Sequence, residues 1–142
     1  MTSTVTIDPK VTPVVLYDGD CGFCGWAVRV VLRHDRAHRF RFAPLGSLAA
    51  DRLLARDGMP TDPGSVVLFD GGRAVTRSDA VLGIVRRLGG GWHLLRVGAL
   101  LPRPLRDGCY DLVARHRGRL GHWFGTRPIG PEERKADDRF LA

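Results

Sequence analysis

Cysteine is scarce in this chain, and long apolar runs are missing. Three cysteines in 142 residues are too few for the disulfide framework that holds small secreted domains together. No stretch approaches the roughly 20 apolar residues that a bilayer-spanning helix needs. Residues 1–10 are polar and lack the apolar core of a signal peptide. We therefore expect a cytoplasmic protein that has no membrane partner.

Lysine is also scarce, although the chain is strongly basic. Only two of its 22 basic residues are lysines, and its formal net charge is +7. Such a charge raises nucleic acid as a partner. The arginines, however, are spread through every segment, and no motif that reads nucleic acid accompanies them. We expect no specific nucleic-acid partner, and we expect the charge to favour encounters with acidic proteins.

Length and composition fit one domain with its own core. Hydrophobic residues make up 44% of the chain, and 142 residues can bury a core without disulfides. We expect a single domain over residues 1–125, with its core in 11–89 and a helical extension in 92–125. Residues 126–142 contain two prolines and many charges, a composition that predicts a flexible tail.

Two of the cysteines form a Cys-x-x-Cys motif where a predicted strand meets a predicted helix. Cys21 and Cys24 lie between an apolar run at 14–17 and a segment of helical periodicity at 23–34. Cys21 stands at the start of the helix, where unpaired N–H groups and the macrodipole favour a thiolate. Cys24, one turn further on, can attack a mixed disulfide formed at Cys21. The pattern predicts a redox dithiol in which Cys21 is the nucleophile and Cys24 the resolving thiol.

Three other roles for the two cysteines remain open. A structural disulfide across so short a loop would remove only about 2 kcal/mol of unfolded-chain entropy. A zinc site would need two more ligands, which Cys109, His116 and His122 could supply, although their spacing matches no common zinc module. Two inert thiols are the third possibility. The alternative to an oxidoreductase is therefore a non-catalytic module that holds a metal or a partner protein at the cysteines.

Side chains close to the motif are predicted to take part either in proton transfer or in holding the local structure. Asp18 could accept the proton of Cys24, or it could hydrogen-bond the N–H groups of the turn. Asp20 is expected to cap the helix or to stay in solvent. Trp26 falls on the apolar stripe of the helix, which predicts a place in the core.

The predicted helix at 105–117 carries a third cysteine and several charges. We expect Cys109 to be buried and inert. Arg115 and Arg117 could bind an anion, but pairing with Asp111 and Asp107 at helical spacing is the simpler expectation.

The order of predicted elements indicates an α/β fold. Strands are expected at 11–17, 38–44, 65–69 and 73–76, and helices at 23–34, 47–56, 79–88, 92–101 and 105–117, with Ser47 and Ser78 as N-caps. A strand–helix–strand unit followed by a helix, a hairpin and a helix is the order of the minimal thioredoxin fold. We therefore expect a four-stranded mixed sheet flanked by helices, with a C-terminal helical extension.

Three segments make the chain similar to a known family. They are Tyr17 to Cys24, Ser78 to Ala80, and Tyr110 to Arg117. With them the chain resembles the DCC family of predicted thiol-disulfide oxidoreductases, a thioredoxin-like group named for an Asp followed by two Cys. The resemblance implies catalytic roles for Asp18, Cys21 and Cys24, and no cofactor. It also implies protein or small-molecule thiols and disulfides as substrates, together with an unidentified reductant.

Substrate-binding residues are expected between the two cysteines and in two segments near the same edge of the sheet. Thioredoxins place a cis-proline directly before the strand that faces the cysteines, whereas here Gly64 and Ser65 separate Pro63 from the predicted strand. The expected substrate-binding residues are Gly22, Phe23, Ser65 and Ser78.

Overall fold

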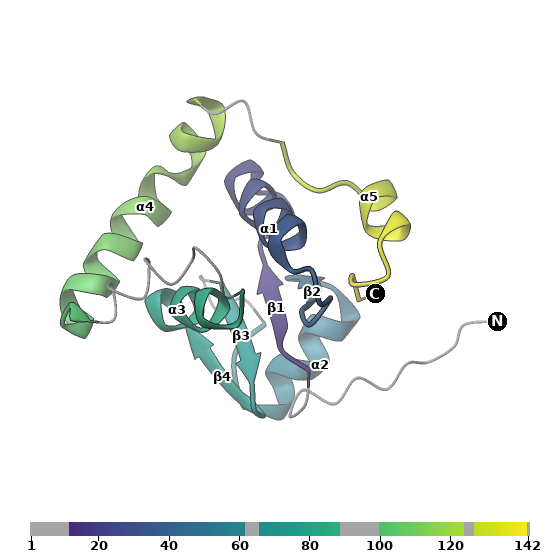
Figure 1. Cartoon of the computed structure of the whole chain (residues 1–142), viewed down its shortest axis with the longest axis horizontal. Coiled ribbons are helices and arrows are strands. Elements are labelled where there is room, and N and C mark those ends of the chain that lie inside the picture. Colours follow the sequence, from purple (N-terminus) through teal and green to yellow (C-terminus); the bar gives the residue numbers. More distant parts are fainter. Residues whose placement is uncertain (1–11, 62–65, 89–99, 124–126, 142) are drawn as a thin grey trace.

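The computed structural model describes residues 12–61, 66–88, 100–123 and 127–141, and a four-stranded mixed sheet forms its centre (Figure 1). The strands are β1 (Val14–Tyr17), β2 (Arg41–Pro44), β3 (Val67–Asp70) and β4 (Arg73–Thr76), in the order β2-β1-β3-β4. β1 runs parallel to β2 and antiparallel to β3, and β3 and β4 form an antiparallel hairpin. The mixed sheet and the parallel β1–β2 pair confirm the predicted topology.

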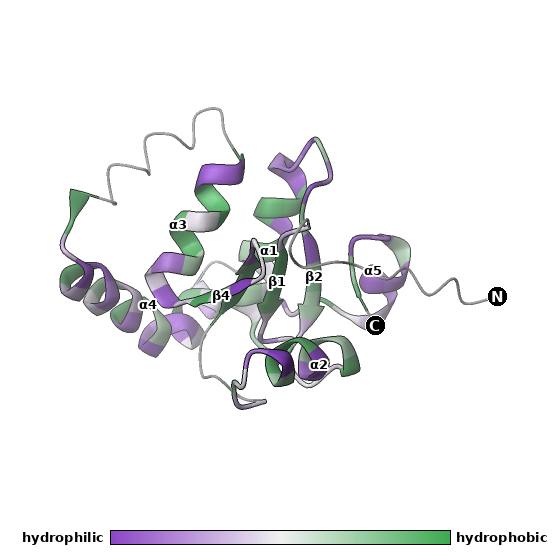
Figure 2. Ribbon diagram, turned by 90° about the horizontal axis from the view of Figure 1, so that it is seen from below, coloured by the Kyte–Doolittle hydropathy of each residue, from purple (hydrophilic) through white to green (hydrophobic). Residues whose placement is uncertain are grey.

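Helices cover both faces of the sheet, as expected for a thioredoxin-like α/β fold. They are α1 (Gly22–His34), α2 (Leu48–Arg56), α3 (Arg77–Leu88), α4 (Arg103–Trp123) and α5 (Pro131–Ala136). Figure 2 shows α2 on one side of the strands and α1 and α3 on the other. Within the described ranges, no helix combines the length and the apolar character needed to cross a membrane.

The central strand β1 separates two hydrophobic clusters. Val15 and Tyr17 pack with the residues of α1 and α3, while Val14 and Leu16 pack with those of α2. All four are at most 3% exposed. A strand covered on both faces needs apolar residues at every position, which is why the run at 14–17 does not alternate.

The starts of α2 and α3 differ from each other. Ser47 caps α2, since its hydroxyl accepts a hydrogen bond of 3.3 Å from the Ala50 N–H. α3 begins at Arg77, directly after β4, and a positive φ of 57° at Arg77 makes the turn. The prediction that Ser78 is the N-cap is therefore wrong: Ser78 lies inside α3 and donates its hydroxyl to Asp107 of α4.

The C-terminal extension is built around the long helix α4. It extends beyond the predicted 105–117 at both ends, and the predicted helix at 92–101 lies mostly outside the described residues. α4 packs against α1 and α3. An ion pair between Arg77 and Asp111 adds to the Ser78–Asp107 hydrogen bond and ties α4 to the start of α3.

The segment 127–141, predicted as a flexible tail, packs against the domain instead. Ile129 is 3% exposed and belongs to the main hydrophobic cluster. Phe140 forms a parallel bridge with Phe42 of β2 and contacts its ring. Buried apolar anchors therefore outweigh the charged composition on which the tail prediction rested. In Figure 1, α4 and α5 lie on opposite sides of α1.

Candidate active site

The dithiol lies where β1 passes into α1, as the sequence predicts. Cys21 is the N-cap residue of α1, with extended backbone (φ −93°, ψ 120°). Its Sγ accepts a hydrogen bond of 3.4 Å from the Cys24 N–H. Both thiols are free and partly buried. A sulfur that takes the place of a capping oxygen faces the N–H groups that stabilise negative charge at a helix start.

Cys24 sits in a setting that disfavours its thiolate. Burial, the hydrogen bond with Cys21 and the charge of Cys21 raise the pKa of Cys24 to about 12, while the nearby Arg117 guanidinium opposes the change. At neutral pH Cys24 is therefore a neutral thiol, and its attack on another sulfur requires the removal of a proton.

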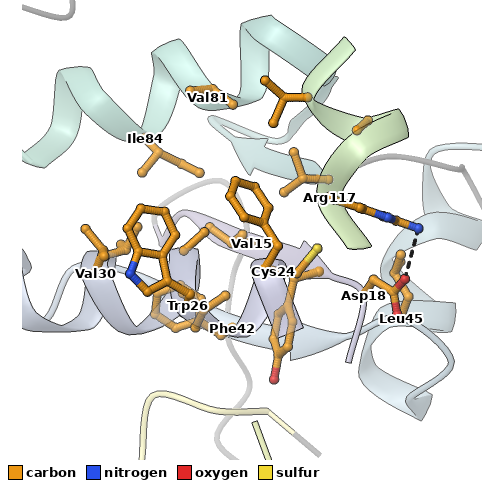
Figure 3. A pocket seen from close by; sticks show the side chains of 18 of the residues that line it. Val15, Asp18, Cys24, Trp26, Val30, Phe42, Leu45, Val81, Ile84 and Arg117 are labelled. Carbon is orange, nitrogen blue, oxygen red and sulfur yellow. Dashed lines mark ion pairs between the residues drawn. The ribbon is translucent and has the colours of Figure 1, made fainter. Parts of the chain in front are cut away.

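Asp18 connects the turn of the dithiol to α4. Its Oδ1 accepts a hydrogen bond of 3.0 Å from the Asp20 N–H, and its Oδ2 lies 3.3 Å from Nη2 of Arg117 (Figure 3). The turn-holding hydrogen bond expected of Asp18 is thus present. Asp18 and Cys24 also line the same cavity, and the charge of Asp18 contributes to the raised pKa of Cys24. Asp20 is exposed and leaves the N-cap position to Cys21.

Two side chains of α4 reach this site, and sequence reasoning did not place them there. Arg117 pairs with Asp18, so the expected pairing along α4 is wrong; the aspartates of α4 contact α3 instead. Tyr110 lines the cavity, and its hydroxyl accepts a hydrogen bond of 3.1 Å from the Val66 N–H. Burial raises the pKa of Tyr110. A spacing of seven residues, two helical turns, could have placed Tyr110 and Arg117 on one face.

A cavity of about 760 Å³ extends from Cys24 between α1, α3 and α4. Phe23 and Trp26 of α1 line it, with ring centroids 5.6 Å apart. Trp26 is 44% exposed, so the prediction that it belongs to the core is wrong. The apolar stripe of α1 is shared between the sheet and this cavity.

Of the predicted substrate-binding residues that the structure describes, Phe23 is the one that it places in the lining of the cavity. Gly22 is the first residue of α1, and Phe23 lines the cavity. Ser65 lies outside the described residues. Ser78 is buried, and it is not among the described residues that line the cavity.

The third cysteine belongs to neither the dithiol nor a metal cluster in the described part of the chain. Cys109 is exposed on α4, which contradicts the expected burial. No group of three or more His, Cys, Asp or Glu side chains in the described ranges is arranged to hold a metal ion. The zinc site considered with Cys109, His116 and His122 is therefore not formed there.

Comparisons with known proteins agree with this arrangement. A family model described as DCC1-like thiol-disulfide oxidoreductase matches residues 15–123. The chain belongs to this family. YuxK, an uncharacterized protein of Bacillus subtilis strain 168, is 34% identical over 115 residues, which cover 80% of this chain and 82% of YuxK. A chloroplastic DCC family protein of Arabidopsis thaliana is 37% identical over 107 residues, covering 74% of this chain and 62% of that relative. No solved structure is significantly similar to the chain.

Proposed function

We propose that this member of the DCC1-like family catalyses thiol-disulfide exchange through Cys21 and Cys24, with protein or small-molecule thiols as substrates. The observation that carries the proposal is the position of Cys21 at the N-cap of α1, where its Sγ accepts the Cys24 N–H. A helix N-terminus stabilises a thiolate, and a thiolate is the attacking species in exchange. Membership of a family described as thiol-disulfide oxidoreductases supports the same reaction.

The reaction proceeds in two displacements. The Cys21 thiolate attacks one sulfur of a substrate disulfide, the substrate S–S bond breaks, and one half leaves as a thiolate. Cys24 then loses its proton and attacks Sγ of Cys21, which releases the second half. Two electrons pass from the protein to the substrate, and the protein is left with a Cys21–Cys24 disulfide.

The second displacement needs a base, because the pKa of Cys24 is raised to about 12. Asp18 is our candidate for that base. It lines the same cavity as Cys24, and its Oδ2 has one ion-pair partner among the described residues, Arg117. A carboxylate within reach of the thiol, directly or through a water, can take the proton as the sulfur attacks.

A trapping experiment tests the proposal. Cys109 is exposed and would itself react, so every variant carries Cys109→Ser. Cys24→Ser should accumulate mixed disulfides that reductant releases, because it can form the intermediate and cannot resolve it. Cys21→Ser is the matched control and should accumulate few. Equal trapping by both variants, or none by either, would refute the assigned roles.

The equilibrium test uses the intact dithiol. In glutathione redox buffers, Cys109→Ser should lose two thiols together at one midpoint, and the change should reverse on reduction. Independent oxidation of the two thiols would contradict a functional dithiol.

A further inference from the structure

The cavity beside Cys24 has the size and the walls of a small-molecule site. Its volume of about 760 Å³ falls within the roughly 300–1,000 Å³ usual for ligand pockets. Three helices supply apolar walls, with Trp26 and Val30 from α1, Val81 and Ile84 from α3, and Val113 from α4. Figure 3 shows Trp26 and Val30 at one end of the cavity and Cys24 between them and the charged end.

Arg117 and Asp18 form the charged end beside Cys24, and Asp51 of α2 is the other charged residue among the described residues that line the cavity. Figure 3 shows the Arg117 side chain reaching from α4 toward Asp18 beside Cys24. The Arg117 side chain is 41% exposed, and its Nη2 lies 3.3 Å from Oδ2 of Asp18. A guanidinium has five N–H donors and can bind a carboxylate through two of them. The net charge of +7 further favours the approach of an anion.

We propose that this cavity binds a small disulfide that has an apolar body and a carboxylate. The apolar body lies against the apolar walls, and the carboxylate contacts Arg117. The disulfide lies at the Cys24 end of the cavity; Cys24 lines the cavity, and Sγ of Cys21 accepts the Cys24 N–H there. This inference rests on the proposed exchange function and adds a substrate class to it. Exchange then follows the two displacements given above: the ligand disulfide takes up two electrons and leaves as two thiols, and the protein dithiol is oxidised.

Shape and size favour a small molecule over a protein chain. Residues of α1, α3 and α4 supply most of the apolar walls of the cavity, and the sheet residues Val15 and Phe42 line it as well. Its volume exceeds what one inserted side chain would fill, and a longer peptide would have to bring polar backbone groups against apolar walls. A compact apolar ligand with one anionic group meets neither difficulty.

Binding is tested without redox chemistry. The triple variant Cys21→Ser, Cys24→Ser, Cys109→Ser is titrated by calorimetry with naphthalene-2-carboxylate and with its neutral analogue naphthalene-2-carboxamide. We expect one site that binds the carboxylate at least tenfold more tightly. Adding Arg117→Gln should remove that preference, whereas Arg115→Gln, which removes the same charge from an exposed position on α4, should keep it.

A second pair of variants tests the place of binding. Ala114 lines the cavity, and Leu112 is 57% exposed and does not. Ala114→Phe should weaken the binding of both naphthalene compounds at least tenfold, and Leu112→Phe should leave it within twofold. If Ala114→Phe does not fold, Val81→Phe fills the cavity from α3 and replaces it.

A redox experiment measures how fast the reduced Cys109→Ser protein reacts with each of two aromatic disulfides. They are 5,5′-dithiobis(2-nitrobenzoate), which carries carboxylates, and the neutral 2,2′-dithiodipyridine. Arg117→Gln should slow reaction with the first at least tenfold and with the second less than twofold.

The outcomes separate the inference from the proposed function. No binding of either naphthalene compound, with exchange intact, overturns the inference alone. Equal affinity for both compounds, unchanged in Arg117→Gln, also overturns it. A further outcome is exchange that is faster with a protein disulfide than with either aromatic disulfide and that is unaffected by Ala114→Phe. That result would show that the substrate does not use the cavity, and it overturns the inference as well. Tight binding that depends on Arg117, combined with no exchange at all, supports the ligand site and contradicts the proposed function.

Discussion

The guanidinium of Arg117 lies 3.3 Å from the carboxylate of Asp18, although 99 positions separate the two residues in the sequence. Asp18 holds the turn that carries Cys21 and Cys24, while Arg117 lies in the last third of α4. The pair brings a positive charge close to a thiol whose pKa is raised to about 12. Helix α4 is therefore part of the candidate site as well as of the fold.

The first prediction concerns the reactivity of the two thiols. In a Cys109→Ser background, Cys21 in Cys24→Ser should react with iodoacetamide faster at pH 7 than Cys24 in Cys21→Ser. Burial is the largest cause of the raised pKa of Cys24, and it remains when Cys21 is replaced. The reaction of Cys24 should therefore increase only well above pH 9. A faster reaction of Cys24 near pH 7 would reverse the assignment of nucleophile and resolving thiol.

The second prediction concerns Glu133 of α5. Hydrogen bonds from Arg29 and Arg127 lower the pKa of Glu133 to about 2. A lowered carboxylate pKa stabilises the fold above the ordinary value near 4.3, and the stabilisation is lost as the pH falls toward 2. Glu133→Gln should lower Tm at pH 7 by a few degrees, since a partly exposed pair contributes at most about 1 kcal/mol.

Glu132→Gln is the matched control for Glu133→Gln. Glu132 lies in the same first turn of α5 and is exposed, so its loss should change Tm less. The Tm difference between Glu133→Gln and the unmodified chain should shrink as the pH falls from 5 toward 2. A difference that stays constant over this range would show that the charge of Glu133 is not responsible.

The strand and helix arrangement around the dithiol was predictable because short-range patterns determine it. An apolar run at 14–17 predicts a strand that is buried on both faces, and Gly19 and Gly22 allow a sharp turn from this strand into a helix. The structure has both the strand β1 and the turn into α1, and β1 pairs with β2 in parallel. Phe40 and Phe42 stand two residues apart in the predicted strand at 38–44, and both lie in one hydrophobic cluster.

Contacts between distant segments were not predictable in this way. The charges of α4 stand at intervals that suit pairing along the helix, yet Arg117 contacts Asp18 and Asp111 contacts Arg77. A local pair is worth only a few tenths of a kcal/mol, so packing of α4 against α1 and α3 decides the partners. Trp26 shows the same limit: periodicity gives its face of α1 and does not say whether that face meets the sheet or a cavity.

The third prediction compares two helical glycines. A Cβ at Gly25 of α1 would lie 2.8 Å from the Arg127 carbonyl oxygen and 3.1 Å from the Ile129 nitrogen, whereas one at Gly118 of α4 would meet nothing within 4 Å. Gly118→Ala should stabilise the chain by about 0.5–1 kcal/mol, because alanine is the better helix former. Gly25→Ala should destabilise it by about 1–3 kcal/mol through overpacking.

Urea denaturation measures both glycine substitutions. The expected result is a shift of the midpoint to higher urea for Gly118→Ala and to lower urea for Gly25→Ala. If both alanines stabilised the chain, segment 127–129 would not pack on α1 in solution.

The last prediction concerns the role of Asp18 in the second displacement. With 5,5′-dithiobis(2-nitrobenzoate) and Cys109→Ser protein, the first released thiolate reports formation of the mixed disulfide, and the second reports its resolution by Cys24. Asp18→Asn should slow the second step by about a hundredfold, as the loss of a general base typically does. The first step should change far less, because the N-terminus of α1, where Cys21 lies, favours its thiolate without help from Asp18. Asparagine keeps the oxygen that accepts the Asp20 N–H, which separates proton transfer from turn geometry.

Arg117→Gln distinguishes loss of the base from loss of the ion pair. It breaks the pair with Asp18 and leaves the Asp18 carboxylate in place. If Asp18 takes the proton of Cys24, Arg117→Gln should slow resolution of the mixed disulfide much less than Asp18→Asn does. The comparison uses the first-order rate constant of the second step, which takes place within the mixed disulfide and does not include the binding of free disulfide. Equal slowing of resolution in the two variants would assign the effect to the ion pair, and equal slowing of both steps in Asp18→Asn would assign it to the turn.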